Sequence, residues 1–330
     1  MNYYFQIEGD IRNNIGDVLQ GMVAIPFLPD NAIVVDRESL AKIPQPGFLI
    51  ANGWYLHSFE NFPPPDNVQP FYVSVHIAKS ELLLDRKTRD HFMKYAPIGC
   101  RDTKTLKLLL GWGIPAYYSS CLTITTHPRN EINHSGIGEC LLVDNIDHPV
   151  PMDVKEKLER LLGEKLTRVS HDPPNTSGSL HDYWSNASTH MESLLKRYCK
   201  ARLVVTTKIH CALPCLGMGA NILVIHPNPA DPRLDTVREF IEILSYTQIQ
   251  NAKSLTPSNV NQQALNERKL FLNRLVNKAV KSKKNPIIYD PFYKSIKKQS
   301  VRQARIYRLL VKIMYRLGIS RGKIKRVYGM

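Results

Sequence analysis

Residues 203–219, LVVTTKIHCALPCLGMG, are the stretch around which the rest of the chain is expected to fold. Residues 203–205 form a short apolar, β-branched run that is typical of a buried strand. After Lys208, His210 opens a helix of small and apolar residues that ends by Gly219. A strand that enters a helix through a cation and an imidazole predicts an anion site, because free N–H groups and the helix dipole favour negative charge. The alternative is that His210 only caps a core helix.

The chain has 330 residues, 43% apolar and 22% charged, which is typical of a globular protein large enough for two domains. No apolar run reaches the roughly 18 residues of a membrane span, and we expect no secretory signal. The six cysteines form no C-x-x-C pair and are expected to be free core thiols of a reducing compartment. The sequence therefore predicts a cytoplasmic protein, and no cluster has the spacing of a metal site.

Positive charge is concentrated at the C-terminal end. Residues 1–250 contain 24 Lys and Arg against 27 Asp and Glu, whereas residues 251–330 contain 20 against 2. These charges of −3 and +18 account for the net +15 and describe a basic tail on a slightly acidic body.

Within the tail, apolar residues from Ile306 to Leu317 recur at helical spacing, with basic residues on another side. Packing against the body and contact of residues 291–330 with an anionic membrane surface are both open readings. Nucleic acid is not an expected partner, because the tail contains no recognisable binding module.

Apolar runs alternate with helical patterns along the first 250 residues, which implies parallel βαβ units. Strands are expected at residues 3–7, 33–36, 48–51, 71–75, 116–125, 140–143, 166–170, 203–205 and 222–225. Helices are expected at about residues 81–95, 103–110, 153–162, 180–199, 210–219, 234–244 and 263–281. We expect two α/β domains, residues 1–130 and 131–250, facing each other across a cleft. A basic, mainly helical extension, residues 251–330, follows them.

Several polar or aromatic side chains follow the expected strands. Asn52, Trp54, His76 and Arg101 all come at or just after a strand end. Ligands of such sheets bind beyond the carboxyl ends of the strands, so these side chains are candidates for a site. The segment from Asn14 to Asp17 is a further candidate, because a glycine there lets backbone approach a ligand. A cap or loop hydrogen bond is the alternative role for each.

The chain resembles the polysaccharide pyruvyl transferase family over roughly residues 10–245. The resemblance is carried by four motifs: Asn14-Ile15-Gly16-Asp17, Asn52-Gly53-Trp54, Pro97-Ile98-Gly99-Cys100-Arg101-Asp102-Thr103, and Leu203-Val204-Val205-Thr206-Thr207-Lys208-Ile209-His210. It implies a GT-B-like pair of Rossmann-like domains. It also implies transfer from phosphoenolpyruvate onto two hydroxyls of a sugar, leaving a cyclic pyruvate ketal, with no cofactor besides this co-substrate.

Site residues follow from the same resemblance. His210 matches the family's catalytic histidine, and an imidazole suits general acid–base work because its reference pKa is about 6.5. Arg101 matches a donor-binding cation. Lys208 and Ile209 stand where the family usually has arginine and leucine; lysine keeps the charge but loses the planar fork of arginine. Candidates for acceptor binding or proton relay are Asn14, Asp17, Asn52, Trp54 and His76.

Two other functions stay open on the sequence. A GT-B-type glycosyltransferase would use the same anion site for a sugar nucleotide, and a glycan-binding relative would keep the fold without turnover. The expected partners are phosphoenolpyruvate and a sugar acceptor, free or lipid-linked, with the protein at the inner face of the membrane if the tail binds lipid.

Overall fold

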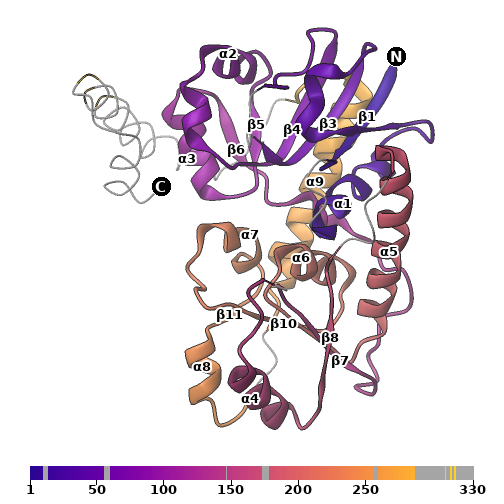
Figure 1. Ribbon diagram of the computed structural model, residues 1–330, viewed down its shortest axis with the longest axis vertical. Coiled ribbons are helices and arrows are strands. Elements are labelled where there is room, and N and C mark those ends of the chain that lie inside the picture. The colour runs from indigo at the N-terminus through magenta and orange to yellow at the C-terminus, as the bar shows by residue number, and fades with distance from the viewer. Residues whose placement is uncertain are drawn as a thin grey trace.

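The protein contains two parallel β-sheets with helices on their faces, seen in a computed structural model (Figure 1). The structure describes residues 1–9, 14–55, 60–145, 147–172, 178–255 and 259–286, together with Leu309, Ile313 and Arg316. The alternation of strands and helices confirms the predicted α/β class and is consistent with two Rossmann-like domains.

The first sheet has six strands in the order β2-β1-β3-β4-β5-β6. Its strands are β1 (Asn2–Ile7), β2 (Ile33–Asp36), β3 (Gly47–Tyr55), β4 (Val68–Ile77), β5 (Ile98–Cys100) and β6 (Ala116–Tyr118). The accompanying helices are α1 (Ile15–Met22), α2 (Arg86–Lys94) and α3 (Thr103–Gly111), with short 3-10 helices η1 (Ile25–Phe27), η2 (Arg37–Lys42), η3 (Ser80–Leu84) and η4 (Leu122–Thr125).

The second sheet has five strands in the order β11-β10-β9-β7-β8. Its strands are β7 (Cys140–Val143), β8 (Leu166–Val169), β9 (Leu203–Thr206), β10 (Ile222–Ile225) and β11 (Ile243–Leu244). The helices are α4 (Met152–Leu162), α5 (Leu180–Lys200), α6 (Ile209–Met218), α7 (Asp235–Arg238), α8 (Tyr246–Asn251) and α9 (Gln262–Ser282), with the 3-10 helix η5 (Pro232–Leu234).

One hydrophobic core joins the two sheets. It contains Phe5 and Phe71 of the first sheet, Leu141 and Val204 of the second, and side chains of α1, α5 and α6 between them. α5 packs on α1 and β2, so a helix that follows a strand of the second sheet covers the first. The two sheets therefore share one packed layer of helices between them (Figure 1).

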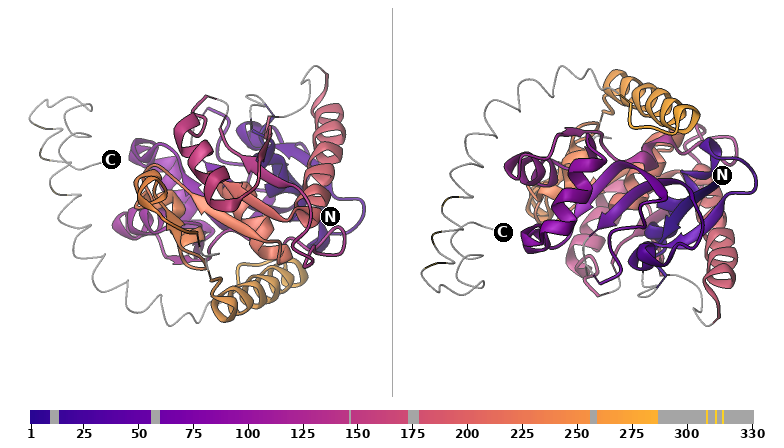
Figure 2. Two further views of the ribbon diagram at one scale, coloured as in Figure 1. Left: turned by 90° about the horizontal axis from the view of Figure 1, so that it is seen from below. Right: turned by 90° about the horizontal axis from the view of Figure 1, so that it is seen from above.

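α9 is part of the same core. The helix predicted at residues 263–281 is confirmed, and its buried apolar side chains belong to the core that joins the sheets. These side chains are Leu265, Leu272, Leu275, Val276 and Ala279. Figure 2 shows α9 along the outside of the body, on a different flank from α5. The domain boundaries at residues 130 and 250 stay predictions.

Three predicted elements were wrong. The strand expected to continue through residues 121–125 is replaced by η4 (Leu122–Thr125), since Thr125 and Thr126 each donate a hydroxyl hydrogen bond to the carbonyl three residues earlier. The helix expected at 234–244 ends at Arg238, because Ile243 pairs with Val224 in the sheet.

The third correction concerns the helix expected at 81–95. It is interrupted at Asp85, whose side chain accepts a hydrogen bond from the backbone N–H of Thr88 and so caps α2. β3 and β4 are also longer than expected. Asn52, Trp54 and His76 therefore lie within the last residues of these strands and not beyond them.

Candidate active site

The carboxyl ends of both sheets open onto one cavity of about 640 Å³. The first sheet contributes residues at or after the ends of β1, β3 and β5, and the start of α1 adds two more. The second sheet contributes residues from the segments that follow each of its five strands. Lining residues of the first group are Glu8, Asn14, Asp17, Trp54 and Arg101. Those of the second include Asp147, His148, His171, Asp172, Lys208, Ile209, His210, His226, Arg233 and Tyr246. The cleft predicted between two α/β units is therefore where strand ends converge.

Arg101 and His210 meet in this cavity. The Nη1 atom of Arg101 lies 3.4 Å from Nε2 of His210, and the two residues are only 1% and 9% exposed. The Arg101 Nε–H has no hydrogen-bond partner, and no carboxylate within the described ranges forms an ion pair with this guanidinium. The nearby charges of Asp17 and Asp102 interact with Arg101 without forming a direct ion pair, so its guanidinium keeps donors free for an anionic ligand.

The N-terminus of α6 opens at the same place. Its N-cap residue, Lys208, provides no side-chain cap, and the backbone N–H groups of Ile209 and His210 have no acceptor in the part of the chain that the structure describes. Unpaired N–H groups and the helix dipole together attract negative charge. Lys208 is half-buried, which lowers the pKa of its ammonium group against the opposing influence of Asp172.

His210 is a neutral imidazole in the ligand-free protein. Burial, with the positive charge of Arg101 as the next cause, lowers the pKa of His210 to about 3, while Asp17 opposes the shift. The ring is also held closely by α1, because a Cβ atom at Gly16 would lie 2.6 Å from its Cβ and Nδ1 atoms. A neutral imidazole in this position can act as an acid–base group once a bound anion offsets burial and the charge of Arg101 and so raises its pKa.

Asn14 and Asp17 place α1 against the cavity. The side chain of Asn14 caps α1 by accepting a hydrogen bond from the backbone N–H of Gly16 (3.1 Å). Asp17 accepts one from Gln20 Nε2 (2.5 Å) and lies 3.5 Å from Arg37 Nη1. Burial alone would raise the pKa of the Asp17 carboxyl. The positive charge of Arg37, with smaller contributions from His210 and Arg101, outweighs burial, so the pKa of Asp17 is lowered.

Asn52 and His76 do not line the cavity. The Asn52 side-chain amide donates to the carbonyl of Gln20 (2.7 Å), which ties β3 to α1. His76 Nδ1 lies 2.7 Å from Oδ2 of the fully buried Asp102, and the His76 ring packs 5.1 Å from that of Trp54. Of the three candidates Asn52, Trp54 and His76, only Trp54 lines the cavity, and His76 packs against it.

Several residues of the cavity region escaped the sequence-based search, among them Glu8, Arg37 and His171. His171 lies just beyond the end of β8, is 1% exposed, and has Nε2 2.8 Å from the Tyr198 hydroxyl. The rule that ligands gather at strand ends would have included Glu8 and His171 had it been applied to every strand. No local signal marks Arg37, because its role depends on distant carboxylates.

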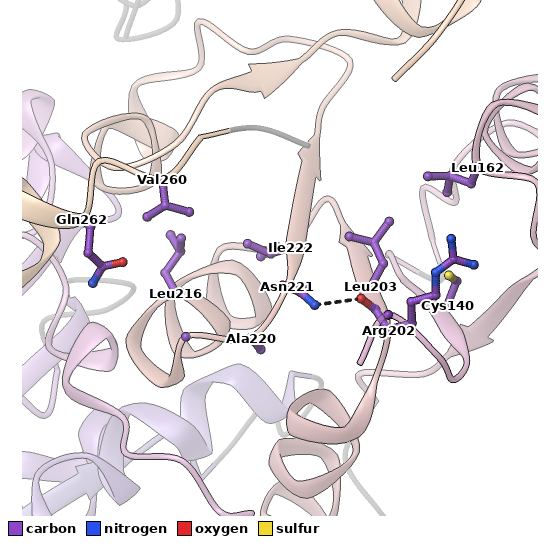
Figure 3. Close-up of a pocket in the computed structure, with 12 residues that line it drawn as sticks. Cys140, Leu162, Arg202, Leu203, Leu216, Ala220, Asn221, Ile222, Val260 and Gln262 are labelled. Atoms are coloured by element: carbon purple, nitrogen blue, oxygen red, sulfur yellow. Dashed lines mark hydrogen bonds between the residues drawn. The ribbon is translucent and has the colours of Figure 1, made fainter. Parts of the chain in front are cut away.

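A second cavity, of about 400 Å³, lies at the opposite ends of the strands (Figure 3). The first residues of β7, β9 and β10 line it, together with Leu216 and Val260. Its one charged lining residue, Arg202, is paired with Glu164 at 2.6 Å. Among the described residues that line it there is no carboxylate or imidazole, and burial raises the pKa of the Cys140 thiol.

The family model for polysaccharide pyruvyl transferase matches residues 14–228, about two thirds of the chain. The chain belongs to the polysaccharide pyruvyl transferase family. The match confirms the resemblance and runs from the cap of α1 past Arg101 and His210 to the segment after β10. Comparison with curated proteins gives no match.

Membership of the polysaccharide pyruvyl transferase family indicates a transferase that modifies a polysaccharide. Within the described ranges, no helix is long and apolar enough to cross a membrane, and no group of three or more His, Cys, Asp or Glu side chains could hold a metal ion. All six cysteines are buried and free.

Proposed function

We propose that the cavity binds phosphoenolpyruvate and transfers its enolpyruvyl-derived group onto two hydroxyls of a saccharide, leaving a pyruvate ketal. The observation that carries this proposal is the buried guanidinium of Arg101, with an unpartnered Nε–H, beside His210 at the N-terminus of α6, which has no side-chain cap. A donor with a phosphate and a carboxylate needs two sets of donors, and this corner of the cavity supplies both cations and free N–H groups.

Donor binding is assigned to three residues. Arg101 takes one anionic group of phosphoenolpyruvate, and the ammonium of Lys208 takes the other as a single point charge. Ile209 contributes its backbone N–H at the first turn of α6, where it has no acceptor in the described part of the chain. Lysine in place of the family's usual arginine leaves the donor less firmly oriented, so the other contacts carry more of the specificity.

His210 is assigned the proton transfers. Its neutral ring takes the proton of the first acceptor hydroxyl, and the resulting imidazolium delivers a proton to the methylene carbon, which becomes a methyl group. Two C–O bonds form at C2 of the donor and its bond to the phosphate oxygen breaks. The second hydroxyl proton leaves with inorganic phosphate, so atoms and charge balance. The anionic donor beside the ring raises its pKa and favours the imidazolium form.

The opposite wall of the cavity is assigned to the acceptor. Asn14, Asp17 and Trp54 line it, and we keep them as acceptor or relay residues. Asn52 and His76 support the acceptor site without contacting the acceptor. Asn52 holds α1 on β3, and His76 packs against Trp54.

The wider setting is also part of the proposal. Two Rossmann-like units whose strand ends face one cavity support a GT-B-like arrangement. In this proposal, residues 291–330 bring the protein to the inner, cytoplasmic face of a membrane. Except for three helical positions, these residues lie outside the part of the chain that the structure describes. The charge of residues 251–330, 20 Lys and Arg against 2 acids, is the support for an anionic lipid surface.

The test is incubation with phosphoenolpyruvate and a panel of free and lipid-linked glycans, with mass spectrometry of the glycans and an assay for released phosphate. We expect the mass of one ketal-linked pyruvate on a glycan and an equal amount of phosphate. Release of a nucleoside diphosphate from a sugar nucleotide would instead support a glycosyltransferase. Glycan binding without turnover of any donor would support a non-catalytic relative.

A further inference from the structure

A row of polar and aromatic residues lies along the carboxyl edge of the first sheet. In spatial order, the residues at or after the ends of the neighbouring strands β2, β1, β3, β4 and β5 are Arg37, Glu8, Trp54, His76 and Arg101. Ile7 pairs with Asp36, which sets Glu8 opposite Arg37. Arg101 therefore lies on the side of the proposed donor site, and Arg37 follows β2 at the far end of the sheet, with three strands between β2 and β5.

Arg37 anchors carboxylates at that far end. Its guanidinium is 2% exposed and lies within 3.3–3.5 Å of carboxylate oxygens of Glu8, Asp17 and Glu38. One positive charge serves three acids, and two of them, Glu8 and Asp17, also line the cavity. Gln20 adds a hydrogen bond to the Asp17 oxygen that faces Arg37. The carboxylates are thus fixed in place beneath the cavity wall.

Two independent features point to a ligand beside these acids. Trp54, on the next strand end, offers a partly exposed indole ring to the same cavity. His171 lines it as well, is 1% exposed, and its Nδ1 atom has no hydrogen-bond partner. The carbonyl of His171 accepts the backbone N–H of Ile15, so this imidazole lies against the start of α1, two residues from Asp17. Buried polar atoms without partners are rare and commonly mark a ligand site.

We propose that Glu8 and Asp17, held by the positioning residue Arg37, bind the two hydroxyls of the acceptor, that Trp54 carries an apolar face of the sugar, and that the acceptor residue is uncharged. This inference rests on the proposed function. The carboxyl groups of Glu8 and Asp17 are hydrogen-bonded to each other, and this bond is among the causes that lower the pKa of Asp17. The pair therefore offers neighbouring acceptor oxygens that suit a diol, and its negative charge repels a sugar that carries its own carboxylate, which would select against such a sugar.

Position relative to the chemistry supports the assignment. Gly16 packs against His210, so the next residue, Asp17, is held beside the catalytic imidazole. An acceptor hydroxyl bound by Asp17 therefore lies close to the group that takes its proton. Arg37 itself lines no part of the cavity and acts only through the carboxylates it holds.

The experiment compares the wild-type chain with Glu8→Gln, Asp17→Asn, Arg37→Lys and Arg37→Met, and uses Glu156→Gln on the exposed face of α4 as the matched control. Steady-state rates give the KM of acceptor and donor separately, and binding of methyl hexosides and methyl hexuronides is measured without donor. We expect the acceptor KM to rise about tenfold or more in Glu8→Gln and Asp17→Asn, since each loses charge-assisted hydrogen bonds, with the donor Kd unchanged within about threefold.

The preference for neutral over acidic sugars is a more specific readout than the acceptor KM. The wild type should bind neutral hexosides at least about tenfold more tightly than hexuronides, and this ratio should narrow in Glu8→Gln and Asp17→Asn but not in the control. Arg37→Lys should retain more acceptor binding than Arg37→Met. Because Arg37→Met leaves three acids without their positive partner, its folding is checked by circular dichroism. If Arg37→Met is unfolded, the comparison of Arg37→Lys with the wild type is the test.

An unchanged acceptor KM in both carboxylate variants, or an unchanged hexoside-to-hexuronide ratio, would overturn the assignment. Failure of the wild type to release phosphate from phosphoenolpyruvate with any glycan would instead overturn the proposed function. The donor-free binding ratio separates the two results, because it does not depend on turnover.

Discussion

Nη1 of Arg101 lies 3.4 Å from Nε2 of His210, although 109 positions separate the two residues in sequence. Arg101 follows β5 of the first sheet and His210 begins α6 after β9 of the second. Their contact therefore exists only when both sheets are folded and packed on the shared core. It joins a buried guanidinium to a neutral imidazole, and several of the expectations below depend on it.

Removing the imidazole should abolish transfer and leave the fold intact. In His210→Ala we expect kcat to fall by about 10²–10⁴-fold, the range typical of a lost general acid–base group. Circular dichroism and thermal unfolding serve as the controls for folding. Full activity in this variant would refute the assignment of His210.

Lys208→Arg should preserve or tighten donor binding, because arginine restores a planar fork for a carboxylate or phosphate. Lys208→Met should raise the Kd of phosphoenolpyruvate about tenfold or more by removing a charge-assisted contact. Isothermal titration calorimetry with phosphoenolpyruvate measures both. A large loss of affinity in Lys208→Arg would show that lysine serves another purpose here.

Gly16→Ala tests the fit between α1 and the ring of His210, the proposed acid–base group. The added Cβ would lie 2.6 Å from two atoms of His210, so either α1 or the ring must move. We expect a loss of about 1–3 kcal/mol in the free energy of unfolding together with reduced kcat. Asn186→Ala, at an exposed position of α5, is the control. Wild-type kcat in Gly16→Ala would mean that the ring position is not critical.

Stability should decrease as the pH falls below about 6.5. Burial, with the positive charge of a neighbour as the next cause, lowers the pKa of both His91 and His210 to about 3. Between pH 6.5 and 3 the unfolded chain binds protons at these sites that the folded chain does not, so each site costs about 1.4 kcal/mol per pH unit.

Urea unfolding at pH 7.5 and 5.5 measures this effect in a window where few carboxylates titrate. His91→Gln should lose less stability between the two pH values than the wild type does. Equal free energies of unfolding of the wild type at both pH values would contradict the prediction.

α9 should contribute to the stability of the whole body. Leu272 is fully buried in the shared core, whereas Leu270, two residues away, is 54% exposed. Leu272→Ala should lower the free energy of unfolding by about 2–5 kcal/mol, and Leu270→Ala should change it by less than about 0.5 kcal/mol. Equal effects of the two substitutions, measured by denaturant unfolding, would mean that α9 is not packed as described.

Local pattern was enough for most of the strands and for the motif around His210. The run from Leu203 to Val205 and the small residues after Lys208 predicted β9 and α6 within one residue, because buried parallel strands and helix starts have strong local signatures. Residues 121–125 were missed because threonine hydroxyls bonded to nearby carbonyls and overrode a β-branched run.

By itself, the sequence determined the α/β class, the family, the candidate donor residues and the separation of charge between body and tail. Only the tertiary structure decided which strand ends meet: it brought Glu8, Asp17, Trp54 and Arg101 to one cavity, left Asn52 and His76 outside it, and added α9 to the core. The physical reason is that propensity and periodicity are local, whereas register and helix packing depend on contacts between residues far apart in the chain.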